Sequence, residues 1–159
     1  MAEYDSDALA GFDEFFGRIL EGLAPAARRR ASRKLGQALL RANLQRISAN
    51  VEPDRGAMEK RKPRLDRRGR VRRSSRGKMF RRLRLQRAWR VDAQPDSVEI
   101  KLRKGDAVAA IHHYGEMGFV GRAPDGRKIY ARYPERRLLG FSREDEKLAL
   151  DIAAELLDG

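Results

Sequence analysis

The sequence predicts an α+β fold, in which two N-terminal helices and a C-terminal helix pack on a small, mainly antiparallel sheet. Two observations carry this prediction. Apolar residues recur at spacings of three and four near both ends of the chain, as in amphipathic helices, and they alternate with polar residues in short stretches of the second half, as in strands. The chain has 159 residues, of which 41% are hydrophobic. This length and composition suit one buried core, so we expect a single domain over residues 1–159.

Two helices are predicted in the first third of the chain. Asp5 or Ser6 can cap the first helix, which can end near Gly22. Its apolar face is formed by Leu9, Phe12, Phe16, Ile19, Leu20 and Leu23. Pro25 suits the first turn of a second helix, because the missing N–H is not needed there, and we expect this helix to extend to about Ala49.

The second helix carries one main apolar stripe among many cations. The stripe consists of Ala27, Ala31, Leu35, Ala38 and Ala42, and it is extended by Leu39 and Ile47. Leu40 and Leu44 lie partly off the stripe. They indicate either a second contact surface or a wider core face, and the pattern leaves both open.

A long, irregular basic loop or arm is expected between the second helix and the sheet, over residues 52–77. Between Lys60 and Arg90 the only acidic residue is Asp66. Proline, glycine and serine in the first half of this run break regular structure. Over residues 78–86, apolar residues lie among the arginines, which predicts a third helix that is amphipathic and basic.

The cations of this stretch are the candidate contact residues for nucleic acid or for neighbouring subunits. They are Arg67, Arg68, Arg70, Arg72, Arg73, Arg76, Lys78, Arg81 and Arg82. Such a density of like charge repels itself unless something anionic lies against it. Three interpretations stay open: a solvated loop, contact with an anionic partner such as a nucleic-acid backbone, and docking on an acidic protein surface.

A β-hairpin is predicted over residues 89–102. Apolar and polar residues alternate on both sides of a Gln-Pro-Asp-Ser turn at residues 94–97. The apolar members are Trp89, Val91, Ala93, Val98, Ile100 and Leu102. This alternation is the signature of a strand, in which successive side chains point to opposite faces.

The remainder of the chain is expected to hold two helices and one strand. A short helix over residues 107–114 precedes a loop over residues 116–127, and a strand follows over residues 128–133. Ser142 and Asp145 resemble a capping box, which predicts the start of the last helix. We expect its apolar residues to lie buried against the sheet; they are Leu148, Ile152 and Leu156.

The sequence offers no catalytic or metal-binding constellation. It has no cysteine, which excludes disulfides and thiolate metal sites and suits a reducing compartment. His112 and His113 are adjacent and do not point the same way on a helix, so each is expected to be packed or hydrogen-bonded rather than a metal ligand. No phosphate-binding glycine loop or nucleophile elbow is present. We therefore expect no enzyme, no metal and no cofactor.

The protein is expected to be soluble and made in the cytoplasm, with no membrane partner. No apolar run approaches the about 20 residues that a membrane span needs, and the N-terminus lacks a signal-peptide pattern. The formal net charge of +13 favours an acidic partner.

Two classes of function fit these features. In a sequence-independent nucleic-acid-binding protein, the arginines would contact phosphates, and Trp89, Phe80 or Tyr114 could stack on bases. In a structural assembly protein, the basic arm would touch nucleic acid or a neighbouring subunit within a larger complex. Solution state separates them, because a lone binding module stays monomeric and an assembly component forms rings or co-purifies with a particle.

Seven short segments carry a family resemblance. They are residues 23–29 (Leu-Ala-Pro-Ala-Ala-Arg-Arg), 45–47 (Gln-Arg-Ile), 52–56 (Glu-Pro-Asp-Arg-Gly), 61–63 (Arg-Lys-Pro), 78–84 (Lys-Met-Phe-Arg-Arg-Leu-Arg), 110–115 (Ala-Ile-His-His-Tyr-Gly) and 132–140 (Arg-Tyr-Pro-Glu-Arg-Arg-Leu-Leu-Gly). In this order and spacing they resemble the phage virion morphogenesis family, also called the tail completion proteins of contractile-tailed phages. The resemblance covers about residues 9–157.

The resemblance implies a non-enzymatic structural protein of the virion neck, which completes the tail so that the tail can join a DNA-filled head. By analogy with related neck proteins, it implies a ring around the DNA channel, most simply a hexamer. The implied partners are other copies of the chain, neighbouring neck, connector and tail proteins, and the packaged DNA backbone. In such a ring the arginines would make sequence-independent backbone contacts or bind acidic surfaces of neighbouring rings, and the sequence does not apportion them.

Overall fold

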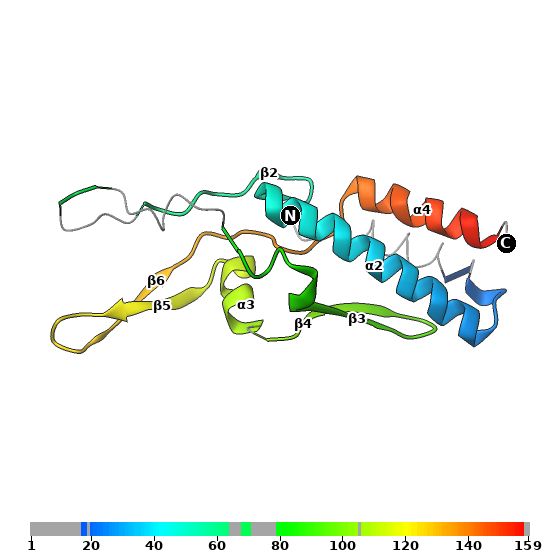
Figure 1. Cartoon of the computed structure of the whole chain (residues 1–159), viewed down its shortest axis with the longest axis horizontal. Helices are drawn as coiled ribbons and strands as arrows, with labels where there is room; N and C mark the ends of the chain where they lie inside the picture. The colour runs from blue at the N-terminus through cyan, green and yellow to red at the C-terminus, as the bar shows by residue number, and fades with distance from the viewer. Residues whose placement is uncertain (1–16, 19, 64–67, 71–78, 105, 158–159) are drawn as a thin grey trace. The chain divides into compact units, whose positions relative to one another are not determined.

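The computed structural model describes residues 17–18, 20–63, 68–70, 79–104 and 106–157 (Figure 1). By its internal contacts the chain divides into two compact units. The first unit comprises Met1–Ala42, Trp89–Leu102 and Phe141–Gly159, and the second unit comprises Asn43–Ala88 and Arg103–Gly140. The single domain predicted from the sequence stays a prediction.

Helix α2 spans Pro25–Ala49, the bounds that the sequence predicts. Proline at the first helical position costs no hydrogen bond, and Asn50 has a φ of 55°, the left-handed conformation in which many helices end. Ahead of α2, residues 17, 18, 20 and 21 are helical and Gly22 lies in a turn, as expected. The earlier part of the predicted first helix lies outside the described residues.

Strands β3 (Trp89–Ala93) and β4 (Val98–Leu102) form the predicted antiparallel hairpin. Gly36 of α2 lies against this hairpin, because a Cβ on Gly36 would be 2.4 Å from Val98 Cγ2 and 2.5 Å from Val91 Cγ1. Any side chain at this position would push the helix and the hairpin apart. Glycine therefore sets how closely the two elements pack.

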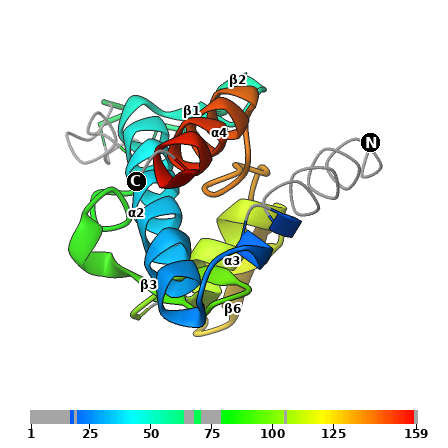
Figure 2. The ribbon, with the colours of Figure 1, turned by 90° about the vertical axis from the view of Figure 1, so that its right-hand side faces the viewer.

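The core of the first unit is formed mainly by α2 and α4, which spans Arg143–Leu157. Figure 2 shows α4 running beside α2. The buried members of the core are Leu20, Ala31, Leu35, Ala38, Leu39, Ala149, Ile152 and Ala153. Leu148 and Leu156 are partly buried against it, so the predicted apolar face of the last helix does point inward, but it packs mainly on α2 and not on the sheet as expected. Most of its partners come from α2, and Ile100 joins from β4.

The start of α4 is the predicted capping box. The backbone N–H of Ser142 donates to Asp145 Oδ2 at 2.9 Å, and the backbone N–H of Asp145 donates to Ser142 Oγ at 3.3 Å. Each side chain thus satisfies a backbone donor that the first turn of a helix leaves without a partner. Both residues are buried, so these bonds are shielded from water.

Of the two leucines that lie off the apolar stripe of α2, Leu40 belongs to a wider core face. Leu40 is only 2% exposed, and Leu44 is half-buried. The interpretation of Leu40 as part of a second contact surface is therefore wrong. A contact between copies of the chain needs another surface.

The second unit contains helix α3 and two hairpins. Helix α3 spans Asp106–Tyr114, close to the predicted residues 107–114. Strands β1 (Val51–Glu52) and β2 (Gly56–Ala57) form a very short antiparallel pair at the start of the segment expected to be irregular. Figure 1 shows the second hairpin of this unit, β5 and β6, extending away from α3.

Strand β5 (Met117–Arg122) corrects the prediction of a loop over residues 116–127. It pairs in antiparallel fashion with β6 (Lys128–Arg132), which is the strand expected over residues 128–133. The register shifts between Phe119 and Gly121, which is typical of a β-bulge. This bulge and the glycines of β5 hide the alternation by which strands are recognised.

The prediction of an amphipathic helix over residues 78–86 is also wrong. Residues 79–85 form turns and bends, and a short 3₁₀ helix, η2, spans Gln86–Ala88. Phe80 has a φ of 55°, which a right-handed helix does not accommodate. Residue 78 lies outside the described residues.

The α+β class is confirmed. In the described part of the chain, the strands form three two-stranded antiparallel sheets in place of the single small sheet that the sequence predicts. The prediction failed because hairpins are local, whereas joining them into one sheet depends on contacts that the sequence pattern does not encode.

Candidate interaction site

Four of the predicted contact cations lie in the described residues. Arg68, Arg70, Arg81 and Arg82 are exposed and belong to the second unit. The other five lie outside the described residues: Arg67, Arg72, Arg73, Arg76 and Lys78. Arg68 and Arg70 lie on the loop where they were expected, whereas Arg81 and Arg82 lie in turns rather than on the helix expected over residues 78–86.

The aromatic residues expected to stack on bases differ in their surroundings. Trp89 is 4% exposed, so its ring is buried and does not present a face to a base. Tyr114 is 67% exposed, and its ring lies edge-to-face against His113 with the centroids 4.6 Å apart. Phe80 lines a cleft in the second unit.

This cleft has a volume of about 580 Å³ and is built from segments far apart in the sequence. They are residues 59–63, the turn at Met79 and Phe80, His112 of α3, and the hairpin β5–β6 with the segment that follows it. The charged lining residues are Glu59, Lys60, Arg61, Lys62, Arg132 and Arg136. Five of these six are cations, so the cleft concentrates positive charge.

Arg136 is the buried charge of the cleft, with 2% of its surface exposed. Its Nε donates to the Glu59 carbonyl oxygen at 2.6 Å, and its Nη1 donates to His112 Nδ1 at 3.2 Å. Burial lowers the pKa of Arg136, while the carboxylates of Glu59 and Glu52 act in the opposite direction. A guanidinium has five N–H groups, so these two bonds leave three further donors for a ligand.

His112 is held by two rings and by Arg136. Phe80 and Tyr133 both lie edge-to-face against the imidazole, with centroids at 5.1 Å and 4.7 Å. Because arginine can only donate, His112 Nδ1 must accept, and the proton of the neutral imidazole lies on Nε2. Burial lowers the pKa of His112, and the charge of Arg136 lowers it further. The expectation of a packed, hydrogen-bonded histidine is confirmed.

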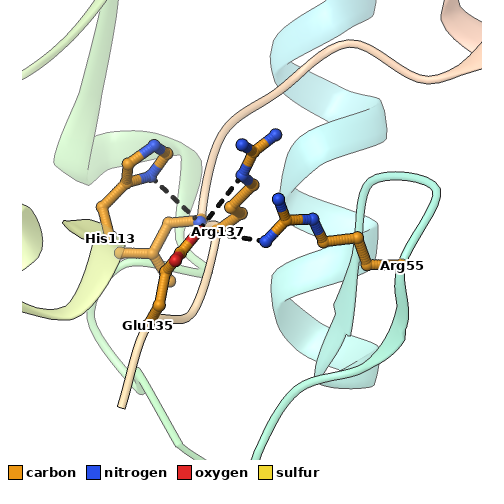
Figure 3. Close-up of polar contacts among 5 residues, drawn as sticks. Arg55, His113, Glu135 and Arg137 are labelled. Atoms are coloured by element: carbon orange, nitrogen blue, oxygen red, sulfur yellow. Dashed lines mark hydrogen bonds and ion pairs between the residues drawn. The ribbon is translucent and has the colours of Figure 1, made fainter. Parts of the chain in front are cut away.

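A second polar cluster surrounds Glu135 (Figure 3). Its Oε1 accepts from Arg55 Nη1 at 3.0 Å and from Arg137 Nε at 3.4 Å. Nearby, His113 Nδ1 accepts the backbone N–H of Leu138 at 3.2 Å. Burial lowers the pKa of His113, and Arg137 lowers it further while Glu135 raises it. These contacts tie the segment after β6 to α3 and to the β1–β2 turn.

The chemistry available in this region is anion binding. Across the residues that the structure describes, no group of three or more His, Cys, Asp or Glu side chains is placed to hold a metal ion. Both histidines serve as hydrogen-bond acceptors of the scaffold. The cleft instead offers several cations beside apolar and aromatic side chains.

A comparison with protein families settles the relationship. The model of the phage virion morphogenesis family matches residues 7–158, almost the whole chain. The chain belongs to the phage virion morphogenesis family. This confirms the resemblance seen in the seven sequence segments.

One relative in the family matches over most of both chains. The chain is 33% identical over 145 residues to tail completion protein S of Escherichia phage P2, and the match covers 89% of this chain and 91% of that protein. No solved structure matches the chain. None of the helices in the described residues is long and apolar enough to cross a membrane.

The structure explains why two of the family segments belong together. Residues 110–115 end α3, and residues 132–140 follow β6. The backbone N–H of Arg136 donates to the His112 carbonyl oxygen at 2.7 Å. Gly115 has a φ of 66°, and a Cβ there would lie 2.9 Å from the backbone N of Glu135. The two segments therefore pack directly on each other, and this close approach needs the glycine.

Sequence reasoning missed the exposed apolar surface of β5 and β6. Its large side chains are between 43% and 54% exposed: Met117, Phe119, Val120, Ile129 and Tyr130. Phe119 and Tyr130 are opposite each other in the register, and their ring centroids are 6.0 Å apart. Two short apolar runs on either side of a Pro-Asp-Gly turn at residues 124–126 were the available signal for this hairpin. We refer to these five residues as the hairpin patch.

Proposed function

We propose that the protein is a non-enzymatic structural component of the phage neck, which completes the tail and joins it to the DNA-filled head as a ring around the channel. In this role it lies in the virion, at the end of the tail that faces the head. Its partners are other copies of itself and the neighbouring neck, connector and tail proteins.

The observation that carries this proposal is the extent of the likeness to tail completion protein S of phage P2. The match covers 89% of one chain and 91% of the other, so it concerns the whole protein rather than a shared module. The name of that relative describes a role in completing the tail. A structural role also agrees with the use of His112 and His113 as fixed hydrogen-bond acceptors.

The hairpin patch supports assembly into a ring. Large exposed apolar patches on soluble proteins mark interaction sites, and a two-stranded hairpin has open edges that can pair with another chain. A closed ring needs a surface on each copy that meets a different surface on the next copy. Six copies are the simplest number by analogy with related neck proteins.

The proposal is tested in phage that lack the protein. We expect filled heads and separate tails to accumulate, and the purified protein should restore joining when it is added to such an extract. Native mass spectrometry of the protein and of purified tails should find a closed multimer. Normal infectious particles in the absence of the protein, or its absence from purified virions, would contradict the proposal.

A matched pair of variants tests the hairpin patch as the ring surface. Phe119→Ser/Tyr130→Ser should leave the melting temperature nearly unchanged and shift the native mass toward monomer. Leu150→Ser removes a similarly exposed apolar side chain from α4 and should leave the multimer intact. If the Phe119→Ser/Tyr130→Ser and Leu150→Ser variants give the same native mass, the ring uses another surface.

Sequence-independent nucleic-acid binding is the second candidate function. Its support is the net charge of +13 and the exposure of Arg68, Arg70, Arg81 and Arg82. It is compatible with a neck role, because DNA must pass such a ring regardless of its sequence.

A further inference from the structure

We infer that the cleft in the second unit is a receptor for a carboxylate carried by an acidic, partly apolar segment of a neighbouring virion protein. The identity of the partner as a virion protein rests on the proposed assembly function. The site itself rests on the geometry around Arg136.

The first argument is the unbalanced charge of the cleft. Lys60, Arg61, Lys62 and Arg132 are exposed along its sides, and Arg136 lies inside. Among the described residues, Glu59 is the only acidic one that lines it. A concave surface with one sign of charge and partly apolar walls concentrates ligands of the opposite sign.

The second argument is the buried charge of Arg136. Its two hydrogen-bond acceptors, the Glu59 carbonyl oxygen and His112 Nδ1, are both neutral. Within the described residues, no carboxylate forms an ion pair with this guanidinium, and the carboxylates of Glu59 and Glu52 favour its charge only from a greater distance. A buried cation is costly unless a counter-charge and further hydrogen bonds compensate it. A carboxylate that accepts two of the three remaining N–H groups supplies both.

The third argument is that the guanidinium is already oriented. The Glu59 carbonyl oxygen holds Nε of the planar guanidinium, and His112 Nδ1 holds its Nη1 atom. His112 is in turn held between Phe80 and Tyr133. A donor group that is held in place before binding loses little entropy when the ligand arrives.

The lining favours a peptide over a nucleic acid as the source of the anion. Half of the cleft is apolar or aromatic; these residues are Pro63, Met79, Phe80, Val120, Ala131, Tyr133 and Pro134. Such walls suit the aliphatic stem of Glu or Asp and an apolar neighbour in the same peptide. The phosphates of a duplex lie on a convex, solvated backbone, which fits this recessed site, where Arg136 is only 2% exposed, less well than a flexible peptide does.

The test is a titration of the full-length protein with two capped peptides that differ only in charge. One carries two glutamates between a leucine and a phenylalanine, and the other carries glutamines at the same positions. The readouts are fluorescence polarisation and the NMR signal of the Arg136 side-chain N–H. We expect saturable binding of the glutamate peptide, a shift of the Arg136 signal, and affinity for the glutamine peptide that is weaker by at least about tenfold.

Variants locate the binding. Lys60→Ala/Lys62→Ala removes two exposed charges of the cleft. It should lower the affinity for the glutamate peptide by about tenfold, because exposed charge pairs contribute up to about 1 kcal/mol each. Arg143→Ala/Lys147→Ala, which changes two exposed cations of α4, should leave the affinity unchanged. Arg136→Lys keeps the positive charge but loses the planar guanidinium that can donate two parallel hydrogen bonds. This variant should bind the glutamate peptide at least about tenfold more weakly. If Arg136→Lys does not fold, the two double variants still decide.

Three outcomes would overturn the inference. They are equal affinity for the two peptides, no shift of the Arg136 NMR signal when the glutamate peptide binds, or an equal loss of peptide affinity in the two double variants. A short thymidine oligonucleotide is the competitor. If it shifts the Arg136 signal more strongly than the glutamate peptide, the cleft binds nucleic acid instead. None of these measurements depends on ring formation, so a monomeric protein that still binds the peptide would count against the proposed ring and not against this site.

Discussion

At the residue scale, the two adjacent histidines show how burial and hydrogen bonding fix a protonation state. His112 Nδ1 accepts from Arg136, and His113 Nδ1 accepts from the backbone N–H of Leu138. Neither donor can act as an acceptor, so a proton on either Nδ1 would face another N–H group. Protonation of each imidazole therefore breaks a bond that joins α3 to the segment after β6.

Stability should depend on pH through these histidines. The folded pKa of His112 and of His113 lies below the ordinary value of about 6.5, chiefly because of burial. Between the folded and the unfolded pKa the unfolded chain binds more protons, so the free energy of unfolding rises with pH in that window. The histidine contribution is complete above about pH 6.5 and is lost as the pH falls toward the folded pKa values. Thermal melts between pH 7.5 and pH 5 should show this loss.

The control replaces both imidazoles without removing the acceptor. In His112→Asn/His113→Asn the amide oxygen can occupy the place of Nδ1, but the side chain does not titrate. This variant should melt at nearly the same temperature across the range. A parent protein whose melting temperature is also flat would contradict the assigned hydrogen bonds.

The histidines also show what the sequence can and cannot predict about the site. Their adjacency on a short helix was enough to predict packed side chains rather than metal ligands. Their partners, Arg136 and Leu138, lie more than twenty residues further along the chain. Nothing in local periodicity identifies such a partner, so the cleft that contains Arg136 could not be predicted.

At the element scale, local signals predicted well wherever a single feature fixes a boundary. Pro25 fixes the start of α2, the Ser142–Asp145 box fixes the start of α4, and the turn at residues 94–97 fixes the hairpin of β3 and β4. The failures have equally physical causes. The bulge and the glycines of β5 hide the alternation of apolar and polar residues that marks a strand. The positive φ of Phe80 is incompatible with the helix that the apolar spacing of residues 78–86 predicts.

Gly36 offers a test of how α2 packs on the hairpin of the first unit. Helix propensity alone favours alanine over glycine by about 1 kcal/mol. A Cβ would, however, lie 2.4 Å from Val98 Cγ2, and overpacking of this kind costs about 1–3 kcal/mol. We expect Gly36→Ala to lower the free energy of unfolding by about 1 kcal/mol.

The double variant separates the clash from other effects. In Gly36→Ala/Val98→Ala the clash with Val98 is relieved while the one with Val91 Cγ1 stays, so the combined loss should be smaller than the sum of the single losses by up to about 1 kcal/mol. Urea unfolding of the four proteins gives this coupling. Strictly additive losses would mean that the helix and the hairpin do not approach as closely as described.

Helix α4 is expected to be an essential part of the core. Ile152 is 5% exposed within the cluster formed with α2, so Ile152→Asp would bury a charge without a partner. We expect this change to cost roughly 3–5 kcal/mol and to lower the melting temperature strongly. Leu150→Asp on the same helix changes a residue that is 45% exposed and should stay within about 0.5 kcal/mol of the parent. Equal effects of the two changes would mean that α4 is not packed in the core.

At the scale of the whole molecule, charge is the feature that the sequence states most clearly. A net charge of +13 is far more than folding requires, and the long basic stretch accounts for much of it. Composition predicts an anionic partner but does not say which one. The structure separates two kinds of cation: Arg136, buried beside a cleft, and exposed arginines such as Arg68 and Arg70 on the basic loop.

We expect the basic loop to bind nucleic acid through phosphates alone. Each phosphate that is neutralised releases condensed counterions, so log affinity should fall linearly with log salt, by roughly 0.9 per contact on duplex DNA. With about four arginines engaged, a fourfold rise in salt should weaken binding by roughly two orders of magnitude. Affinity should hardly vary with sequence, because phosphates carry no sequence information.

A salt titration of the parent and of Arg70→Ala/Arg72→Ala/Arg73→Ala on two unrelated duplexes measures this contribution. The triple variant should show a shallower salt slope, and we expect an unchanged melting temperature because Arg70 is exposed and the sequence predicts all three in the basic loop. A matched variant with three exposed arginines of α2 replaced, Arg29→Ala/Arg30→Ala/Arg33→Ala, removes the same charge elsewhere. If both variants lower the slope equally, binding reflects net charge alone. If the loop variant leaves the slope unaltered, these arginines serve protein contacts in the virion.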